Sequence, residues 1–343
     1  MLWCPSCSRI VNELVARDPD ELLSELLFGF LGTQLLYVVA ELGIADLINE
    51  EPQAVEVLAS RAGAMPDVLY RFLRALASLG VFAEVQERAF AHTASSLLLR
   101  RESGTGRHEF ALVYGSIYRA FAEAAPAARS GENMFERASG AGWWEWLAGR
   151  PELGAAFNRA MQAGAQARLV ALKNFPWHEV ETVVDVGGGN GTLLIGLLEQ
   201  QPHLRGVIFD LPEVAPAASL RIADASLSDR CSVEAGSFFE RVPEGGDVYL
   251  LAKVLHDWDD APALEILRRV RSSATAETRL LVLESVVTSE AGSQRTKMLD
   301  LVMLALVNGR ERTADEWHRL FSQGGWLATS IEDGLIEAQA PSR

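Results

Sequence analysis

The hydrophobic pattern of the chain changes its period near residue 181. Before that point apolar residues recur at helical spacing, most clearly from about 20 to 50 and from about 105 to 175. After it, short β-branched runs alternate with helical segments, which is typical of a doubly wound, Rossmann-like and mostly parallel α/β sheet. Strands are predicted at 182–186, 206–209, 231–235, 247–252 and 279–284, helices at 192–200, 212–222, 261–273 and 317–321, and antiparallel edge strands at 327–330 and 335–338.

The first hundred residues have the pattern of a winged helix. After the apolar segment 20–50, in which a second helix is predicted from Leu35 to Leu47, helices are expected at 54–62 and 66–79, and a hairpin at 81–85 and 89–92. The second of these helices offers only Arg71 and Arg74 as cations, so a structural or dimerisation role is favoured over DNA binding. The wide apolar stripe that precedes it is suited to a dimer surface.

Charge and composition exclude several classes of partner. The net charge is −15, which argues against nucleic acid or an anionic membrane as the main partner. No signal peptide and no run of 18 uncharged apolar residues is recognised, so we expect a cytoplasmic protein without a transmembrane helix. Cys4 and Cys7 form half of a zinc knuckle without a second pair at knuckle spacing, so no metal site is predicted.

A glycine-rich segment follows the first predicted strand of the sheet. The strand contains Asp185, and glycines follow at 187, 189 and 191, before a helix that starts at Thr192. Glycine lets the backbone turn sharply and approach a ligand closely. Because Thr192 occupies the last position of the dinucleotide pattern, the loop favours S-adenosylmethionine over NAD.

The second predicted strand ends at Asp210, 25 positions after Asp185. This is near the spacing at which an acidic side chain accepts hydrogen bonds from both ribose hydroxyls of a nucleotide. The alternative is that Asp210 caps the helix that follows. The third strand ends at Gly236-Ser237-Phe238-Phe239, where adenine could lie between apolar rings.

His256 follows the fourth predicted strand and is flanked by Asp257, Asp259 and Asp260. An imidazole titrates near neutrality, and the ends of parallel strands face the ligand crevice of an open sheet. We therefore interpret His256 as a general base that removes the proton of a phenol, rather than as a structural histidine. Glu284 and Glu311 are candidates to orient the imidazole; the alternative is that both are surface acids.

Aromatic residues gather in the helical segment before the sheet. The run 143–146 contains three tryptophans, among them Trp143, and Phe157 and Met161 share a helix face farther on. Such residues pack domain cores, and they also line clefts for flat aromatic substrates.

Five motifs occur in an order that resembles one family: Asp185-Val186-Gly187-Gly188-Gly189-Asn190-Gly191, Phe209-Asp210-Leu211-Pro212, Gly236-Ser237-Phe238-Phe239, Lys253-Val254-Leu255-His256-Asp257-Trp258-Asp259-Asp260 and Gly309-Arg310-Glu311-Arg312-Thr313. Together they are similar to the S-adenosylmethionine-dependent O-methyltransferases of the caffeic-acid and bacterial polyketide type. The resemblance covers nearly the whole chain, including an N-terminal winged-helix dimerisation domain.

The resemblance implies a role for each matching residue. His256, Glu284 and Glu311 would be catalytic. The residues that would bind the cofactor are Asp185, Gly187, Gly189, Asp210, Leu211, Gly236, Ser237, Phe238, Lys253 and Trp258. The residues that would contact the aromatic substrate are Trp143, Phe157, Met161, Asp257 and Met303.

Two positions depart from the family pattern. Ser237 stands where the family often has an aspartate that contacts adenine, and the segment 306–308 is shorter than in plant members. Some bacterial members also use S-adenosylmethionine for hydroxylation or decarboxylation instead of methyl transfer.

The sequence therefore predicts a cytoplasmic, homodimeric O-methyltransferase that acts on a phenolic hydroxyl of a small aromatic secondary metabolite. Its expected parts are a dimerisation domain at 1–100, a helical connector that lines the substrate pocket at 101–175 and a cofactor-binding domain at 176–343. Non-methyl chemistry on a similar substrate is the alternative enzyme. A winged-helix regulator with a vestigial ligand domain is the alternative outside enzymology.

Overall fold

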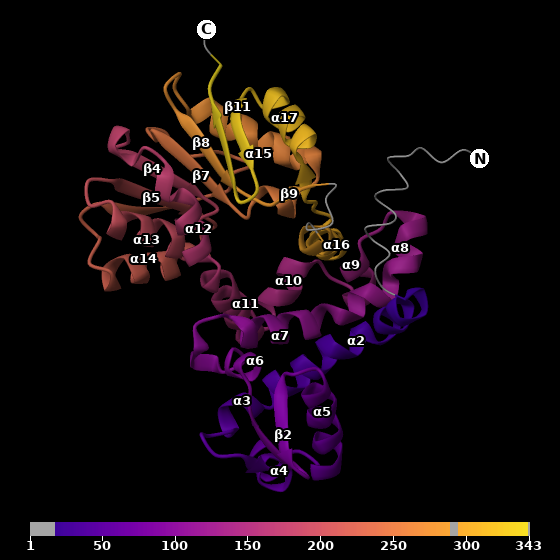
Figure 1. Ribbon diagram of the computed structural model, residues 1–343. Coiled ribbons are helices and arrows are strands. Elements are labelled where there is room, and N and C mark those ends of the chain that lie inside the picture. The colour runs from indigo at the N-terminus through magenta and orange to yellow at the C-terminus, as the bar shows by residue number, and fades with distance from the viewer. Residues whose placement is uncertain (1–17, 289–293, 342–343) are drawn as a thin grey trace. The chain divides into compact units, whose positions relative to one another are not determined.

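The computed structural model describes residues 18–288 and 294–341, so the predicted half knuckle at Cys4 and Cys7 lies outside the described residues. The chain forms two compact units, one of residues 1–119 with 147–163 and the other of residues 120–146 with 164–343. Figure 1 shows their elements. The three-part division at residues 100 and 175 stays a prediction.

The first unit is mainly helical. Its helices are α2 (Pro19–Glu41), α3 (Ile44–Leu47), α4 (Val55–Ala62), α5 (Pro66–Ser78), α6 (Ala94–Leu97), α7 (Arg107–Ile117) and α11 (Pro151–Ala163), and its strands are β1 (Gln53–Ala54), β2 (Phe82–Gln86) and β3 (Ala89–His92). Gly80 has a φ of 76° just after α5, and this left-handed residue ends the helix where the sequence predicted.

The predicted winged helix is present with one addition. Strands β2 and β3 pair as the expected hairpin, and the two-residue strand β1 joins β3 to make a three-stranded sheet in the order β1-β3-β2. Phe82 and Phe90 of this sheet are completely buried against α4 and α5. A two-residue strand is too short to show any period in the sequence.

Helix α2 runs farther than predicted. The apolar pattern predicted a second helix from Leu35, whereas α2 continues to Glu41 and the break comes at Gly43, with a φ of 62°. A glycine in the left-handed region stops a helix more effectively than a change in its apolar pattern. By length and composition α2 would be able to cross a membrane, and most of it is exposed. That a membrane segment is absent therefore stays a prediction.

The second unit is built on a seven-stranded sheet in the order β11-β12-β8-β7-β4-β5-β6. Its strands are β4 (Thr182–Val186), β5 (Arg205–Asp210), β6 (Cys231–Ala235), β7 (Val248–Ala252), β8 (Arg279–Leu283), β11 (Leu327–Glu332) and β12 (Leu335–Gln339). Strands β4 to β8 are parallel, and β12 pairs antiparallel with β8, as the tail of the sequence predicted. The doubly wound fold class is confirmed.

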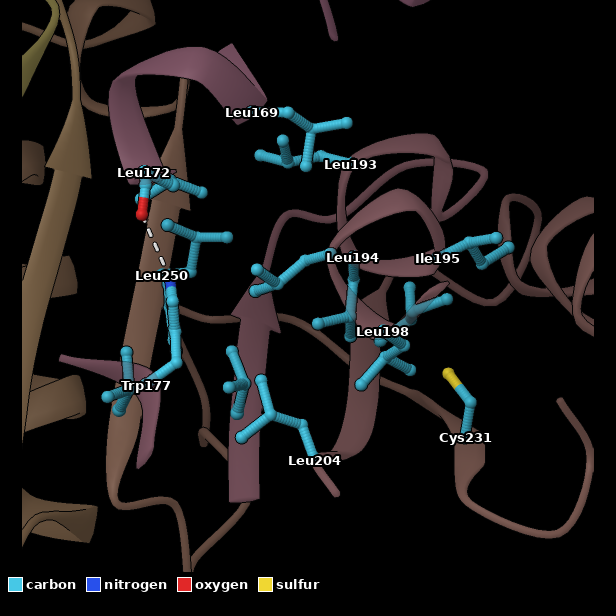
Figure 2. Close-up of a cluster of buried hydrophobic side chains, with 14 of the residues drawn as sticks. Leu169, Leu172, Trp177, Leu193, Leu194, Ile195, Leu198, Leu204, Cys231 and Leu250 are labelled. Carbon is cyan, nitrogen blue, oxygen red and sulfur yellow. Dashed lines mark hydrogen bonds between the residues drawn. The ribbon is translucent and has the colours of Figure 1, made fainter. Parts of the chain in front are cut away.

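Helices cover both faces of this sheet (Figure 1). The helices of this unit are α8 (Ala124–Ser130), α9 (Met134–Ser139), α10 (Trp143–Ala148), α12 (Ala165–Ala171), α13 (Thr192–Gln200), α14 (Ala215–Asp224), α15 (Asp260–Ser273), α16 (Gln294–Val307) and α17 (Ala314–Gln323). Leucines of α12 and α13 form one core with the strands, shown in Figure 2, and α15 and α17 form the other. Within the first core the indole Nε1 of Trp177 donates to the carbonyl of Leu172 at 2.9 Å.

Helix α16 and two short strands of the second unit were absent from the predicted set. Strands β9 (Val286–Val287) and β10 (Arg312–Thr313) form a small parallel pair, and helix α16 lies between them in the chain. Helix α14 begins at Ala215, three residues later than predicted. The pair β9–β10 matters for the site because it brings residues 309–312 beside the end of β8.

Candidate active site

The strand order places the candidate site. The chain passes outward from β4 through β5 to β6 and then returns to β7 on the other side of β4. This reversal is a topological switch point, and ligands of open α/β sheets bind outside the carboxyl ends of the strands there. Asp185, Asp210, Lys253 and Glu284 lie at or just beyond the ends of β4, β5, β7 and β8.

The glycine loop after β4 has the backbone that its sequence predicted. Gly187 and Gly189 have φ values of 72° and 59°, in the left-handed region. A Cβ at Gly187 would lie 2.7 Å from a methyl group of Val254, whereas a Cβ at Gly189 would meet no atom within 4 Å. The first glycine is needed for packing, and the second leaves open space beside the loop.

Asp210 is tied to this loop. Its Oδ2 accepts a hydrogen bond from the Gly189 amide at 2.7 Å, and its Oδ1 accepts one from the Leu211 amide at 2.7 Å. Helix α14 begins only at Ala215 with Val214 as its N-cap residue, so the helix-cap alternative for Asp210 is wrong. Burial raises the pKa of this carboxyl above its ordinary value.

Asp185 is buried, with 1% of its surface exposed. Within the part of the chain that the structure describes, its Oδ1 accepts no hydrogen bond. Burial raises its pKa to about 7, with a further contribution from the nearby charge of Asp210. A buried acceptor without a donor at a ligand-binding edge suits a cationic ligand group.

Aromatic rings surround the end of β6. The centroids of Phe238 and Trp258 lie 6.2 Å apart with an interplanar angle of 86°, and Phe239 packs against both rings. Gly236 lies close to the ring of Phe209, where a Cβ would be only 2.9 Å away. Ser237 Oγ accepts a hydrogen bond from the Phe239 amide at 3.3 Å. The rings meet edge to face, and their contact with adenine stays a prediction.

His256 lies in the short 3₁₀ helix Leu255–Asp257 and is buried, with 7% of its surface exposed. Its Nδ1 lies 2.7 Å from Glu311 Oε1 and 3.6 Å from Glu284 Oε2. Because a carboxylate only accepts, Nδ1 carries the proton of this bond, and Nε2 is left for a second partner. Glu284 and Glu311 are both buried, so the alternative that they are surface acids is wrong.

The charges around His256 are coupled. Burial alone lowers its pKa, but Glu284, the hydrogen bond with Glu311 and the charge of Asp257 outweigh burial and raise the pKa above 6.5. Burial alone raises the pKa of Glu284, and the charges of His256 and Lys253 outweigh it and lower that pKa. Glu284 is therefore held as a carboxylate.

Lys253 follows β7 and carries a φ of 58°, which is unusual for a residue with a side chain. Its Nζ donates to Glu284 Oε2 and to Ser285 Oγ, each at 3.2 Å. A strained backbone kept at a strand end is typical of a functional site. The predicted contact of Lys253 with the cofactor is untested.

Asp257 faces the other ring nitrogen of His256. Its Oδ1 lies 3.5 Å from Nε2, and burial raises its pKa to about 6. Near neutral pH a fraction of this carboxyl is therefore protonated, and in that form it donates a hydrogen bond.

The same cluster has metal-ligand spacing. One ligand atom from each of His256, Glu284 and Glu311 lies within 4.8 Å of the others. His256 Nδ1 donates to Glu311 Oε1, and Glu284 Oε2 accepts from the ammonium of Lys253. Glu311 Oε2 has no hydrogen-bond partner among the described residues. A metal ion would have to displace these two hydrogen bonds, and the expectation that the site holds no metal stays a prediction.

The predicted substrate residues fall in different places. Trp143 is buried and packs edge-on against Phe135 at a centroid distance of 5.3 Å. Phe157 and Met161 lie half-buried on α11, in the first unit, and Met303 lies half-buried on α16, where its carbonyl accepts from the Gly309 amide at 3.2 Å. Their contact with a substrate stays a prediction.

Sequence reasoning missed Arg168. This residue lies on α12, and its positive charge acts on the carboxylates of Asp185 and Glu284. It comes from a helix that precedes the sheet, whereas strand ends are the positions at which an open α/β sheet is expected to hold its ligand. An arginine between apolar residues in a helix carries no local signal of its partner.

Comparisons with known proteins identify the family of the chain. An O-methyltransferase domain matches residues 118–327, and an O-methyltransferase dimerisation domain matches residues 24–101. The chain is 41% identical to the phenazine O-methyltransferase PhzM of Lysobacter antibioticus, with 96% of this chain and 98% of that protein covered. It is 34% identical to the mitomycin biosynthesis 6-O-methyltransferase of Streptomyces lavendulae, with 89% and 88% covered.

A solved structure supports the same relationship. The O-methyltransferase NcsB1 from neocarzinostatin biosynthesis, solved with S-adenosyl-L-homocysteine and 1,4-dihydroxy-2-naphthoic acid, superposes with a TM-score of 0.81 and 33% identity, covering 91% of this chain and 96% of that one. The methyltransferase family uses S-adenosylmethionine, which confirms the cofactor predicted from the glycine loop. The chain therefore belongs to the S-adenosylmethionine-dependent O-methyltransferases that carry an N-terminal dimerisation domain.

Proposed function

We propose that the protein methylates a phenolic hydroxyl group of a small aromatic secondary metabolite, with His256 as the general base. The observation that carries this proposal is the 2.7 Å contact between His256 Nδ1 and Glu311. This contact keeps the proton of the neutral imidazole on Nδ1 and leaves Nε2 to take the phenol proton. As that proton arrives, Glu284 and Glu311 stabilise the imidazolium.

The residues at the glycine loop fit S-adenosylmethionine. The Oδ1 of Asp185 suits its ammonium group, and open space beside Gly189 admits its amino-acid part. The Asp210 carboxylate suits ribose hydroxyls, and Phe238 and Trp258 offer ring surface to adenine. When bound, this cofactor supplies an activated methyl group. The protein supplies orientation, a dry environment and the base.

The pH dependence of the reaction follows from the same cluster. Only the neutral imidazole accepts the phenol proton, and its neighbours raise the pKa of His256. We therefore expect kcat/KM to rise with pH, with its midpoint above the ordinary histidine value of 6.5.

The test compares His256→Ala with His178→Ala, which removes an exposed imidazole far along the sequence. Replacing His256 should lower kcat by about 10²–10⁴-fold, while the dissociation constant for S-adenosylhomocysteine measured by calorimetry changes little. Loss of binding and turnover together would overturn the assignment of His256 as base. Product mass separates the gain of a methylene from the gain of an oxygen, which would indicate the non-methyl chemistry.

We also propose that the protein is a cytoplasmic homodimer that binds neither nucleic acid nor membranes. Helix α2 exposes a row of large apolar side chains, which are Leu22, Leu23, Leu26, Leu27, Phe28, Phe30 and Leu31. A second copy of the chain would cover them. A stable monomer in light scattering would contradict the dimer, and salt-sensitive DNA binding would favour the regulator instead.

A further inference from the structure

Residues 309–312 lie directly against the short helix that carries His256. The amide of Arg310 donates to the carbonyl of His256 at 2.8 Å. A side chain at Gly309 would collide with that same carbonyl oxygen, so only glycine permits the approach. The segment that supplies Glu311 to the imidazole therefore also holds the backbone of His256.

Arg312 extends this contact from one point to three. Its side chain is completely buried, with 0% of its surface exposed. Nη1 donates to the carbonyl of Leu255 at 3.0 Å, and Nη2 donates to the carbonyl of Trp258 at 2.9 Å. The guanidinium thus binds one carbonyl on each side of His256.

Two further contacts fix the guanidinium itself. Its Nε donates to Asp260 Oδ1 at 3.0 Å, and its carbon lies 5.4 Å from the ring centroid of the buried Trp317. The N–H donors of a guanidinium have fixed directions relative to one another, so a guanidinium held in place also fixes the positions of the acceptors that it binds. A lysine at this position would keep the charge and the pairing with Asp260, but it would lack the fork.

We propose that Arg312 is a positioning residue that sets the orientation of His256 through the backbone carbonyls of Leu255 and Trp258. The inference rests on the proposed function, since it concerns the same base. The rival explanation is that Arg312 stabilises the fold through its ion pair with Asp260. The two explanations predict different results when the positive charge at position 312 is kept but the forked donors of the guanidinium are removed.

Arg312→Lys makes this change, and Arg310→Lys is the matched control. Arg310 lies two residues away, is partly exposed and also pairs with Asp260, at 3.3 Å. The first readout is the pKa of His256, measured by NMR of histidine-labelled protein without ligand and assigned with His256→Gln. The second is the division of the effect between kcat and the dissociation constant for S-adenosylhomocysteine.

If Arg312 positions the base, Arg312→Lys lowers kcat by roughly 10- to 100-fold. The imidazole pKa should move toward 6.5, because the hydrogen bond with Glu311 and the carboxylates raise it in the native geometry. Affinity for S-adenosylhomocysteine should change less than kcat. Arg310→Lys should leave the pKa and kcat within about twofold.

A wild-type pKa of His256 together with wild-type kcat in folded Arg312→Lys would overturn the inference. A second variant, Asp260→Asn, weakens the ion pair and leaves both carbonyl contacts. It should change kcat less than threefold, and a loss matching that of Arg312→Lys would show that the ion pair is responsible. If wild-type protein binds S-adenosylhomocysteine but methylates no phenol, the proposed function fails while the pKa readout still decides the role of Arg312.

Discussion

Two buried carboxyl groups lie on either side of β7, and their pKa values move in opposite directions. Asp185 of β4 has its pKa raised to about 7, whereas the pKa of Glu284, which follows β8, is lowered. Both groups are almost completely buried. Glu284 contacts the ammonium of Lys253 and the ring of His256, while Asp185 is close to the charge of Asp210. Burial alone therefore does not determine charge; the neighbours do.

The difference divides the site into two parts with different tasks. At Glu284 the protein supplies its own cations and keeps a fixed negative charge beside the base. At Asp185 the charge of Arg168 acts from α12, but Oδ1 accepts no hydrogen bond from the described residues. The first arrangement supports the proposed proton transfer, and the second supports the proposed binding of a cationic ligand group.

Between the two carboxyl groups, the larger effect on turnover is expected from Glu284→Gln. Removing this charge leaves Lys253 without its ion-pair partner and the imidazolium with one carboxylate fewer beside it, which destabilises the fold by about 3 kcal/mol. The pKa of His256 falls, so the rising limb of the pH–rate profile moves to lower pH and kcat drops roughly 10- to 10³-fold. Kinetics across pH and thermal unfolding measure both effects, with Glu265→Gln on the surface as control. If the rising limb of the pH–rate profile stayed at the same pH, Glu284 would not control the pKa of His256.

Asp185→Asn should act in the opposite sense on stability. A pKa raised from 3.8 to about 7 means that the folded state becomes less stable as pH rises through this range. The amide removes that penalty, so the variant should be more stable than wild type at pH 8, by up to roughly 4 kcal/mol. The gain should shrink toward pH 5. S-adenosylmethionine should bind more weakly, and a variant that is less stable at pH 8 would refute this account of Asp185.

A smaller effect concerns the stability that His256 itself contributes. A histidine pKa above 6.5 in the folded state stabilises the protein fully below that pH, and the contribution is lost as pH rises through the folded pKa. The contribution of Glu284 has the opposite limits: it is present above 4.5 and is lost as pH falls. The melting temperatures of wild type and His256→Gln should therefore differ more at pH 6 than at pH 9. The reverse order would mean that burial dominates at His256.

The smallest effect should come from Ser237→Asp, which restores the acidic residue that the family often has after its third strand. One added hydrogen bond to the adenine amino group is worth about 1 kcal/mol, or roughly fivefold in affinity. Calorimetry with S-adenosylhomocysteine measures this gain, and Ser237→Ala is the control. Unchanged affinity would mean that adenine does not reach the end of β6.

Much of the sheet could be predicted because each parallel strand is a continuous apolar run. The predictions for β4 and β6 match residue by residue, and those for β5, β7 and β8 differ by one residue at one or both ends. The predicted bounds are wrong, or an element is missing, where the apolar pattern of the sequence gives no local signal. Two-residue strands such as β1 and β9 form only because a partner strand is already present, and the break after α2 depends on the backbone of one glycine.

For the candidate site, the sequence identified His256, Glu284 and Glu311 through strand ends and motifs. It left open whether the two glutamates were surface acids. They lie 28 and 55 positions after His256, and a separation of that length along the chain does not show whether a side chain is buried. Their place against the imidazole depends on the packing of residues 309–312. Arg312 went unrecognised for the same reason, because its partners are backbone carbonyls more than fifty positions away.

The sequence by itself determined the fold class, the glycine loop and the identity of the groups at the strand ends. These properties are local, because apolar periodicity and backbone freedom act over a few residues. Only the tertiary structure decided that the pKa of Glu284 is lowered and that Glu311 binds Nδ1 of His256. It also decided that Arg312 donates to the backbone carbonyl of Leu255, next to His256. Those properties depend on burial and on distances between segments far apart in the chain, and folding alone brings those segments together.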